Sequence, residues 1–221
     1  MSEAKKTASG RRGETRGRID KRQAILEAAF RTFAREGYGQ SCVREIASEA
    51  GVAKPTIYNH LGDKETLFHE SMRAALLRTA SRQLAALDQL RRTDGDVCSL
   101  LQEAGYRFLG AYCGEESRAL RGLLCAEAAH FPDLLDFVQQ EGAQRIHDTL
   151  ADRLARLALA GRLSLRSPEL ASEQLLALLT GPMELRSRLG SREVPDAELR
   201  SVAHAAIDTF LCAYGPRDAN T

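Results

Sequence analysis

The sequence predicts an all-α protein, a conclusion that rests on composition and on the spacing of apolar residues. The 221 residues are 43 % hydrophobic and 28 % charged, which is typical of a globular chain and excludes wholesale disorder. Aromatic residues make up only 5 %, whereas Ala, Leu, Arg and Glu are abundant, and this balance favours helices over strands. Apolar residues recur at helical intervals between Gly and Pro punctuation, which indicates nine helices and no strand.

The N-terminal part begins with a basic arm. Residues 1–18 offer almost no apolar side chain to offset the entropy of ordering, so we expect them to be disordered. The first helix spans residues 19–36, and Gly37 can stop it. Ser41, placed shortly before Glu45, is close to a capping signal for a second, short helix.

A third short helix covers residues 54–60, and Pro55 suits its first turn because the missing N–H costs nothing there. Asp63 is placed to cap a fourth, longer helix over residues 64–90. The remaining predicted helices cover residues 100–112, 118–129, 133–160, 169–189 (bent or interrupted at Gly181-Pro182) and 196–214 (capped by Asp196).

Charge is divided unevenly along the chain. Residues 1–64 hold 13 basic and 8 acidic side chains, a net charge of +5, whereas residues 65–221 hold 18 and 22, a net charge of −4. A cationic arm attracts polyanions because each neutralised phosphate releases counterions. The alternative is a solvated tail that only aids solubility. The acidic second part is a poor surface for nucleic acid.

Several functional classes find no support in the sequence. Five widely spaced cysteines without a C-x-x-C pair indicate reduced thiols in the cytoplasm and neither a metal site nor a disulfide framework. No apolar run approaches the roughly 18–20 residues of a membrane span, and no secretory signal is visible. The usual nucleophile, phosphate-loop, zinc-protease and dinucleotide motifs are absent. We therefore expect no enzyme activity, no cofactor and no membrane partner.

Residues 43–60 have the spacing of a helix-turn-helix. Ala47 is small enough for two helices to cross closely, Gly51 permits a left-handed turn, and Ile57 packs back. Both helices are too short to be stable alone, so they require packing on the helices before and after them. Short helices of this kind beneath a basic arm are typical of proteins that read the major groove of DNA.

The same region resembles a known family over residues 19–70. The matching segments are RQAILEAA (22–29), GY (37–38), SCVREIASEAGV (41–52), TIYNHL (56–61) and KE-x-L (64–67). This pattern is similar to the N-terminal domain of the TetR family of transcriptional regulators. Residues 126–181 resemble more loosely the effector domains of the AefR-like branch. The resemblance implies a three-helix DNA-binding domain joined to a larger domain that binds an effector and dimerises.

The resemblance also implies a set of DNA-contacting residues. These are Arg44, Lys54, Pro55, Thr56, Tyr58, His60 and Lys64. Arg44 and Lys54 can reach guanine acceptors, whereas Tyr58 can donate to a phosphate. Lys64 stands near the positive end of its helix, where a phosphate is welcome. The alternatives are helix packing for Tyr58, a helix-end role for His60 and a solvated face for Arg44.

Four positions depart from the family pattern. Ala53 replaces the serine that commonly caps the third helix, Pro55 stands where glycine is frequent, and Leu61 replaces an aromatic residue. Pro55 partly compensates for the missing cap. Cys42 replaces a serine or threonine and is a weaker donor, which puts a phosphate contact there in doubt.

We assign residues 19–66 to DNA binding, residues 67–215 to ligand binding and dimerisation, and residues 216–221 to a tail. The helices at 169–189 and 196–214 carry broad apolar faces with small residues, which favour a dimeric four-helix bundle over packing within one chain. The candidate pocket residues are Met72, Tyr106, Phe108, Tyr112, Phe131 and Phe137, although most aromatic residues at helical spacing are ordinary core.

The function expected is that of a homodimeric repressor on a palindromic operator in double-stranded DNA, released by a small lipophilic effector. The fourth helix would act as a lever that widens the spacing of the two reading helices. Two other functions remain open, an architectural DNA-binding protein of the nucleoid that takes no ligand, and a helical enzyme or carrier with an incidental basic tail.

Overall fold

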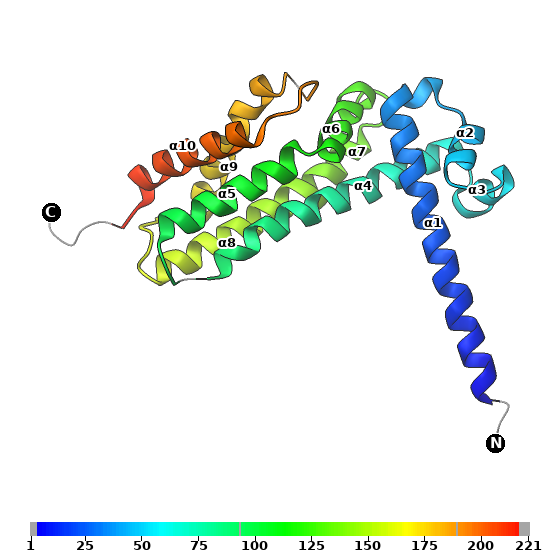
Figure 1. Cartoon of the computed structure of the whole chain (residues 1–221), viewed down its shortest axis with the longest axis horizontal. Coiled ribbons are helices and arrows are strands. Elements are labelled where there is room, and N and C mark those ends of the chain that lie inside the picture. The colour runs from blue at the N-terminus through cyan, green and yellow to red at the C-terminus, as the bar shows by residue number, and fades with distance from the viewer. Residues whose placement is uncertain (1–3, 93, 189, 217–221) are drawn as a thin grey trace. The chain divides into compact units, whose positions relative to one another are not determined.

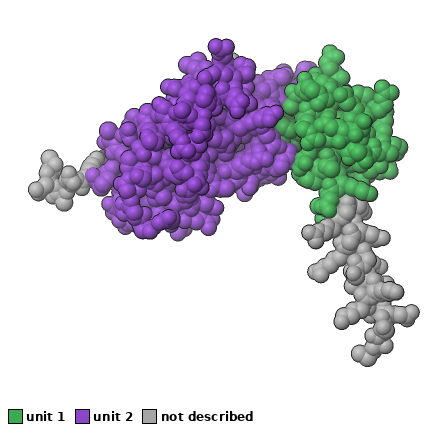
Figure 2. Space-filling view, viewed as in Figure 1, with its two compact units in different colours: residues 1–75 green, residues 76–221 purple. Residues whose placement is uncertain are grey.

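The computed structural model describes residues 4–92, 94–188 and 190–216, with only the backbone course given for residues 4–18. Within these ranges the helical elements form nine continuous stretches, because some adjoining elements follow one another without a break, and no strand occurs. The predicted all-α class is therefore confirmed (Figure 1). The chain divides into two compact units, Met1–Ala75 and Leu76–Thr221 (Figure 2). The division falls inside the fourth helix, later than the border at residue 66 expected from the sequence.

Unit 1 contains three helices and the start of a fourth. They are α1 (Ala4–Gln40), α2 (Val43–Glu49), α3 (Lys54–Leu61) and α4 (Lys64–Leu87). The backbone of α1 is helical from Ala4, over most of the stretch that the sequence assigns to a disordered arm; the arm's side chains lie outside the described residues. Gly37 interrupts the helical geometry with a φ of 77°, as its position predicts.

An aromatic cluster holds α1 and α4 together in unit 1. Phe33 and Phe68 are both fully buried, and their rings meet edge to face with centroids 5.0 Å apart. The ring of Tyr38, which follows the Gly37 break, also meets Phe68 at 5.0 Å. Ile57 and Leu61 of α3 are 1 % and 4 % exposed, so the short third helix is anchored by burial of one face.

The capping signal at Ser41 is not used as the sequence suggests. The residue that precedes α2 is Cys42, which makes no side-chain capping bond, and the Ser41 hydroxyl donates instead to the Tyr38 carbonyl at 2.8 Å. Ser41 therefore satisfies a carbonyl left open by the Gly37 break rather than the N–H groups of α2.

Acidic residues of α2 are tied to α1 by ion pairs. Glu49 accepts hydrogen bonds from Arg31 at 2.6 Å and from the Thr32 hydroxyl at 3.1 Å, and Arg35 donates to Glu45 at 3.0 Å. The Arg31 hydrogen bond is the largest cause that lowers the pKa of Glu49 below its ordinary value. The carboxylate form of Glu49 is thereby favoured in the folded protein.

Replacing Glu49 by Gln is expected to weaken α2 by about 1 kcal/mol at neutral pH. Because the folded-state pKa of Glu49 is lowered, its contribution is present above the unfolded pKa and is lost as pH falls through the folded value. Amide hydrogen exchange in α2 should therefore differ between wild type and Glu49→Gln at pH 7, and the gap should close as the pH falls through the folded pKa. The control is Glu173→Gln, at an exposed residue with no ion pair to any described residue. Equal exchange rates in α2 of the wild type and Glu49→Gln at pH 7 would show that the Glu49 ion pair does not stabilise this helix.

Unit 2 contains the rest of α4 and the helices that follow it. They are η1 (Asp88–Arg91), α5 (Val97–Cys113), α6 (Glu115–Glu127), α7 (Asp133–Phe137), the π-helical η2 (Val138–Gln144), α8 (Arg145–Leu159), α9 (Pro168–Arg186) and α10 (Asp196–Tyr214). The stretch α7–η2–α8 corresponds to the single helix predicted at residues 133–160.

Three predicted details of unit 2 were wrong. Helix α6 begins at Glu115 rather than at 118, because Gly114 both ends α5 and holds the N-terminal capping position of α6. Helix α9 is not interrupted at Gly181-Pro182, because it continues through Pro182, and it ends at Arg186 rather than 189. Asp196 is the first residue of α10 and the capping position is held by Pro195.

The core of unit 2 forms where α5, α8, α9 and α10 pack together. Gly105 allows α5 to approach its neighbours closely, since a Cβ there would lie 3.2 Å from Leu179 of α9 and 3.7 Å from Ala203 of α10. Phe108 and Phe210 are the largest side chains buried in this core. No helix within the described ranges has both the length and the apolar character needed to cross a bilayer.

Candidate nucleic-acid interface and internal cavity

Helices α2 and α3 form the predicted helix-turn-helix. Ala47 is 3 % exposed at the crossing, and its carbonyl accepts the Val52 N–H at 3.0 Å across the turn. Gly51 has a φ of 66°, a conformation that side chains with a Cβ rarely adopt. Together with buried Ile57, these residues confirm the steric roles assigned from their spacing.

The outward face of α3 carries most of the predicted DNA contacts. Lys54 and Pro55 are exposed, Thr56 and His60 are half-buried, and Tyr58 is 41 % exposed. This exposure of Tyr58 favours an outward-facing role over the alternative of packing between helices. The Lys54 ammonium lies 5.6 Å from the centre of the Tyr58 ring, so the two side chains form one cationic and aromatic patch.

Asn59 was missed by the sequence analysis. It is exposed on the same helix beside Tyr58, and a carboxamide can make two hydrogen bonds to adenine. Its position between two chosen residues, Tyr58 and His60, was the available signal.

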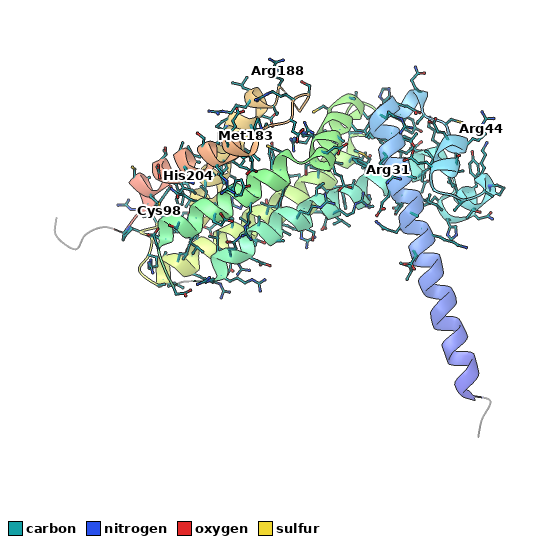
Figure 3. The ribbon with its side chains drawn as sticks, in the orientation of Figure 1. Arg31, Arg44, Cys98, Met183, Arg188 and His204 are labelled. Atoms are coloured by element: carbon teal, nitrogen blue, oxygen red, sulfur yellow. The ribbon has the colours of Figure 1, made fainter. Side chains whose placement is uncertain are left out.

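Arg44 is exposed on α2 (Figure 3). Its side chain makes no hydrogen bond or ion pair with any described residue. The neighbouring carboxylates of Glu45 and Glu49 are bound by arginines of α1, as described above. The positive charge of Arg44 is thus left available for an external partner, whereas the nearby negative charges are compensated.

The Lys64 side chain, unlike that of Arg44, is held by contacts within unit 1. Its ammonium lies 4.7 Å from the centre of the Tyr38 ring and 3.5 Å from the Gly39 carbonyl oxygen. The N-terminus of α4 is capped by Asp63, whose carboxylate accepts the Thr66 N–H at 2.7 Å, and this bond lowers the pKa of Asp63. A phosphate at this end of α4 would meet that carboxylate, and the contact predicted for Lys64 stays a prediction.

Cys42 occupies the capping position of α2 and is exposed. The backbone N–H groups of Arg44 and Glu45 stabilise its thiolate and lower the pKa of the thiol. Cys113, the other extreme, is buried, and burial raises the pKa of its thiol. No group of three or more side chains suited to a metal ion occurs in the described part of the chain.

Unit 2 contains a cavity of about 260 Å³ that is partly open to solvent. Its wall is formed by α4, α5, α6, η2, α8 and α9, and it is mostly apolar, with Leu76, Leu120 and Leu124 among the lining residues. Of the six aromatic and Met residues predicted to line a pocket, Phe108 and Tyr112 do so. The π-helical turn η2 contributes Gly142, where a Cβ would lie 3.1 Å from Leu76.

The other four predicted residues do not line this cavity. Met72 and Phe131 are buried at 2 % and 7 % exposure as core residues, and Phe137 is half-buried. Tyr106 faces α10, where its hydroxyl donates to Asp196 at 2.6 Å and Arg200 stacks on its ring at 3.7 Å.

Two cavity residues were missed by the sequence analysis. Gln83 of α4 and Arg121 of α6 both line the wall. Gln83 falls in the apolar stripe of its helix, between Ala80 and Leu87. A polar residue at such a position could have indicated a cavity residue from the sequence.

Comparison with known proteins agrees with this geometry. Residues 25–71 match the model of bacterial regulatory proteins of the tetR family. Residues 99–216, more than half of the chain, match the model of the AefR-like transcriptional repressor C-terminal domain. The chain therefore belongs to the TetR family of transcriptional regulators, which bind DNA.

Individual relatives support the same assignment. A crystal structure of a putative TetR-family transcriptional regulator from Mesorhizobium loti shares 30 % identity, covering 90 % of this chain and 98 % of that one, with a TM-score of 0.82. The regulator BetI of Brucella suis is 29 % identical over 80 % of this chain and 84 % of its own length. The regulator AcrR of Shigella flexneri is 31 % identical over 136 residues, 58 % of this chain, and the match spans 62 % of AcrR.

Proposed function

We propose that this regulator is a homodimeric repressor that places α3 of each copy in the major groove of a palindromic operator and is released by a small lipophilic effector. The carrying observation is the outward face of α3, where Lys54, Tyr58 and Asn59 are exposed beside Arg44 of α2. A helix presented in this way has the size and chemistry that the major groove admits. Because the target is bacterial DNA, we expect the protein in the cytoplasm.

The proposed contacts divide into two kinds. Arg44 and Lys54 donate to guanine O6 and N7 and supply sequence preference, and Asn59 is suited to adenine. Tyr58, together with Thr56 and His60, donates to phosphate oxygens, which fixes the register without reading sequence. Pro55 contributes shape, since it fixes the backbone of the first turn of α3.

Arg44→Ala and Lys54→Ala should each weaken binding to the operator by about 1–3 kcal/mol and relax sequence preference. The measurement is fluorescence anisotropy at about 150 mM salt, with an operator duplex selected from random sequence and a scrambled duplex beside it. Arg107→Ala is the matched control, since Arg107 is an exposed arginine of α5 in the other unit. If both variants bind like the control, α3 and α2 do not read the DNA.

Dimerisation is assigned to α9 and α10. Their exposed surface includes small residues such as Ala177 and Ala213, and these border a shallow groove that also contains Leu178 and Pro182. Leu170 and Leu185 of α9 are 49 % and 83 % exposed, so this helix presents further apolar surface to solvent. A second copy of the same two helices can cover this surface by two-fold symmetry.

Ala213→Glu should shift the protein from dimer to monomer, because it places an unpaired charge in the groove between α9 and α10. The mass in solution is measured by light scattering after size exclusion. Ala126→Glu serves as the control, since Ala126 is an exposed alanine of α6 that does not line the groove. A wild-type monomer, or a dimeric Ala213→Glu variant, would contradict the assignment.

The cavity supports the ligand response. Leu76, Thr79, Ala80 and Gln83 of α4 line it, and α4 is continuous from Lys64, where the helix begins behind the helix-turn-helix. A ligand that packs against α4 can favour one position of this helix over another. The shift is limited to the ligand's differential affinity, typically about 1–3 kcal/mol of coupling.

A further inference from the structure

The polar groups of the cavity in unit 2 are unevenly satisfied. The hydroxyls of Thr79 and Thr180 donate to carbonyls of their own helices, and the Ser117 hydroxyl donates to the Ala111 carbonyl. These three donors are therefore committed within the protein. Gln83 and Arg121, by contrast, retain unused hydrogen-bonding capacity.

Gln83 is 9 % exposed, lines the cavity and has no hydrogen-bond partner within the described part of the chain. A carboxamide without a partner in the protein completes its hydrogen bonds with water or with a ligand, so Gln83 can serve a polar group in the cavity. Its free amide in a mostly apolar wall indicates that the cavity suits a molecule with a polar group as well as an apolar body.

Arg121 supplies the charge. Of the described residues that line the cavity, it alone is ionised at neutral pH. Its Nη1 donates to the Tyr112 carbonyl at 2.8 Å, and its guanidinium stacks on the Tyr112 ring at 4.1 Å. No ion pair joins it to a described carboxylate, so the guanidinium is oriented but not neutralised, with donors left for a ligand.

No negative charge among the described residues in the wall of the cavity competes with a ligand for Arg121. The Tyr112 hydroxyl donates to Glu184 at 2.8 Å, and Glu184 itself is exposed and does not line the cavity. Burial raises the pKa of Tyr112 to about 12, so the phenol is neutral at physiological pH. An anion that enters the cavity meets one cation and no fixed negative charge from the lining.

We propose that the effector is a small amphipathic carboxylate, whose anionic group pairs with Arg121 and whose apolar body packs against the leucines of the cavity. The volume of about 260 Å³ lies near the lower end of ligand pockets, which suits a short acyl or single-ring acid. This inference rests on the proposed ligand response and specifies its chemistry. Arg121 acts as the residue that selects the charge of the ligand.

The test compares three probes of equal length, decanoate, decanol and decylamine, by calorimetric titration below their micelle concentrations. Decanoate should bind the wild type more tightly than decanol, and decylamine most weakly. Arg121→Met should weaken decanoate by about 10- to 100-fold and leave decanol nearly unchanged, because a charged hydrogen bond is removed. Arg121→Lys should recover part of the preference, and Arg107→Met, outside the cavity, should behave like the wild type.

Melting curves verify that each variant is folded, since Arg121 also stacks on Tyr112. If Arg121→Met is unfolded, the folded Arg121→Lys and Arg121→Gln proteins decide the same comparison. The proposal is overturned if decanol binds the wild type as tightly as decanoate, if none of the three probes binds, or if folded Arg121 variants bind decanoate normally.

A parallel anisotropy titration on operator DNA separates this inference from the proposed function. Release of DNA by decanol without decanoate binding overturns the carboxylate assignment and leaves the repressor intact. If decanoate binds in an Arg121-dependent way but does not change the affinity for DNA, the carboxylate site is supported. The proposed release of DNA by a ligand is then contradicted.

Discussion

The surface of α3 that faces solvent depends on the burial of its other side. A helix of eight residues is not stable alone in water, and α3 has no side-chain cap at Ala53. It is held because Ile57 and Leu61 enter the core of unit 1, which Phe33 and Phe68 complete. This apolar contact fixes the rotation of α3 about its axis, and it thereby determines that positions 54, 58 and 59 point outward.

The packing of α2 against α1 also determines which charged side chains of unit 1 are paired. Ion pairs between α1 and α2 bind the carboxylates of Glu45 and Glu49, whereas Arg44, one residue away from Glu45, stays unpaired among the described residues. In unit 2 the pattern is similar on a smaller scale. Tyr112 orients Arg121 and leaves its charge uncompensated toward the cavity. In both units the residues around one arginine, Arg44 or Arg121, are neutral or already paired, so that arginine can bind an external anion.

Local features of the fold could be predicted from the sequence because their causes are local. Gly51 adopts the left-handed conformation that its turn requires, Asp63 caps α4, and the apolar stripes mark the helices. The cavity was harder to predict. Helical spacing places Tyr106 on the apolar face of its helix, but it does not show which neighbouring helix that face meets. Arg121 lines the cavity with residues of distant helices, so only the packed structure identifies it.

The most direct test of the central claim is a methylation-protection footprint of the protein on its operator. Dimethyl sulfate modifies guanine N7 in the major groove, the atom that we expect Arg44 and Lys54 to cover. The account predicts protected guanines in two patches about one helical turn apart, on the same face of the duplex, and loss of that protection in Lys54→Ala. Protection confined to the minor groove, or unchanged guanine reactivity in a stable complex, would contradict it.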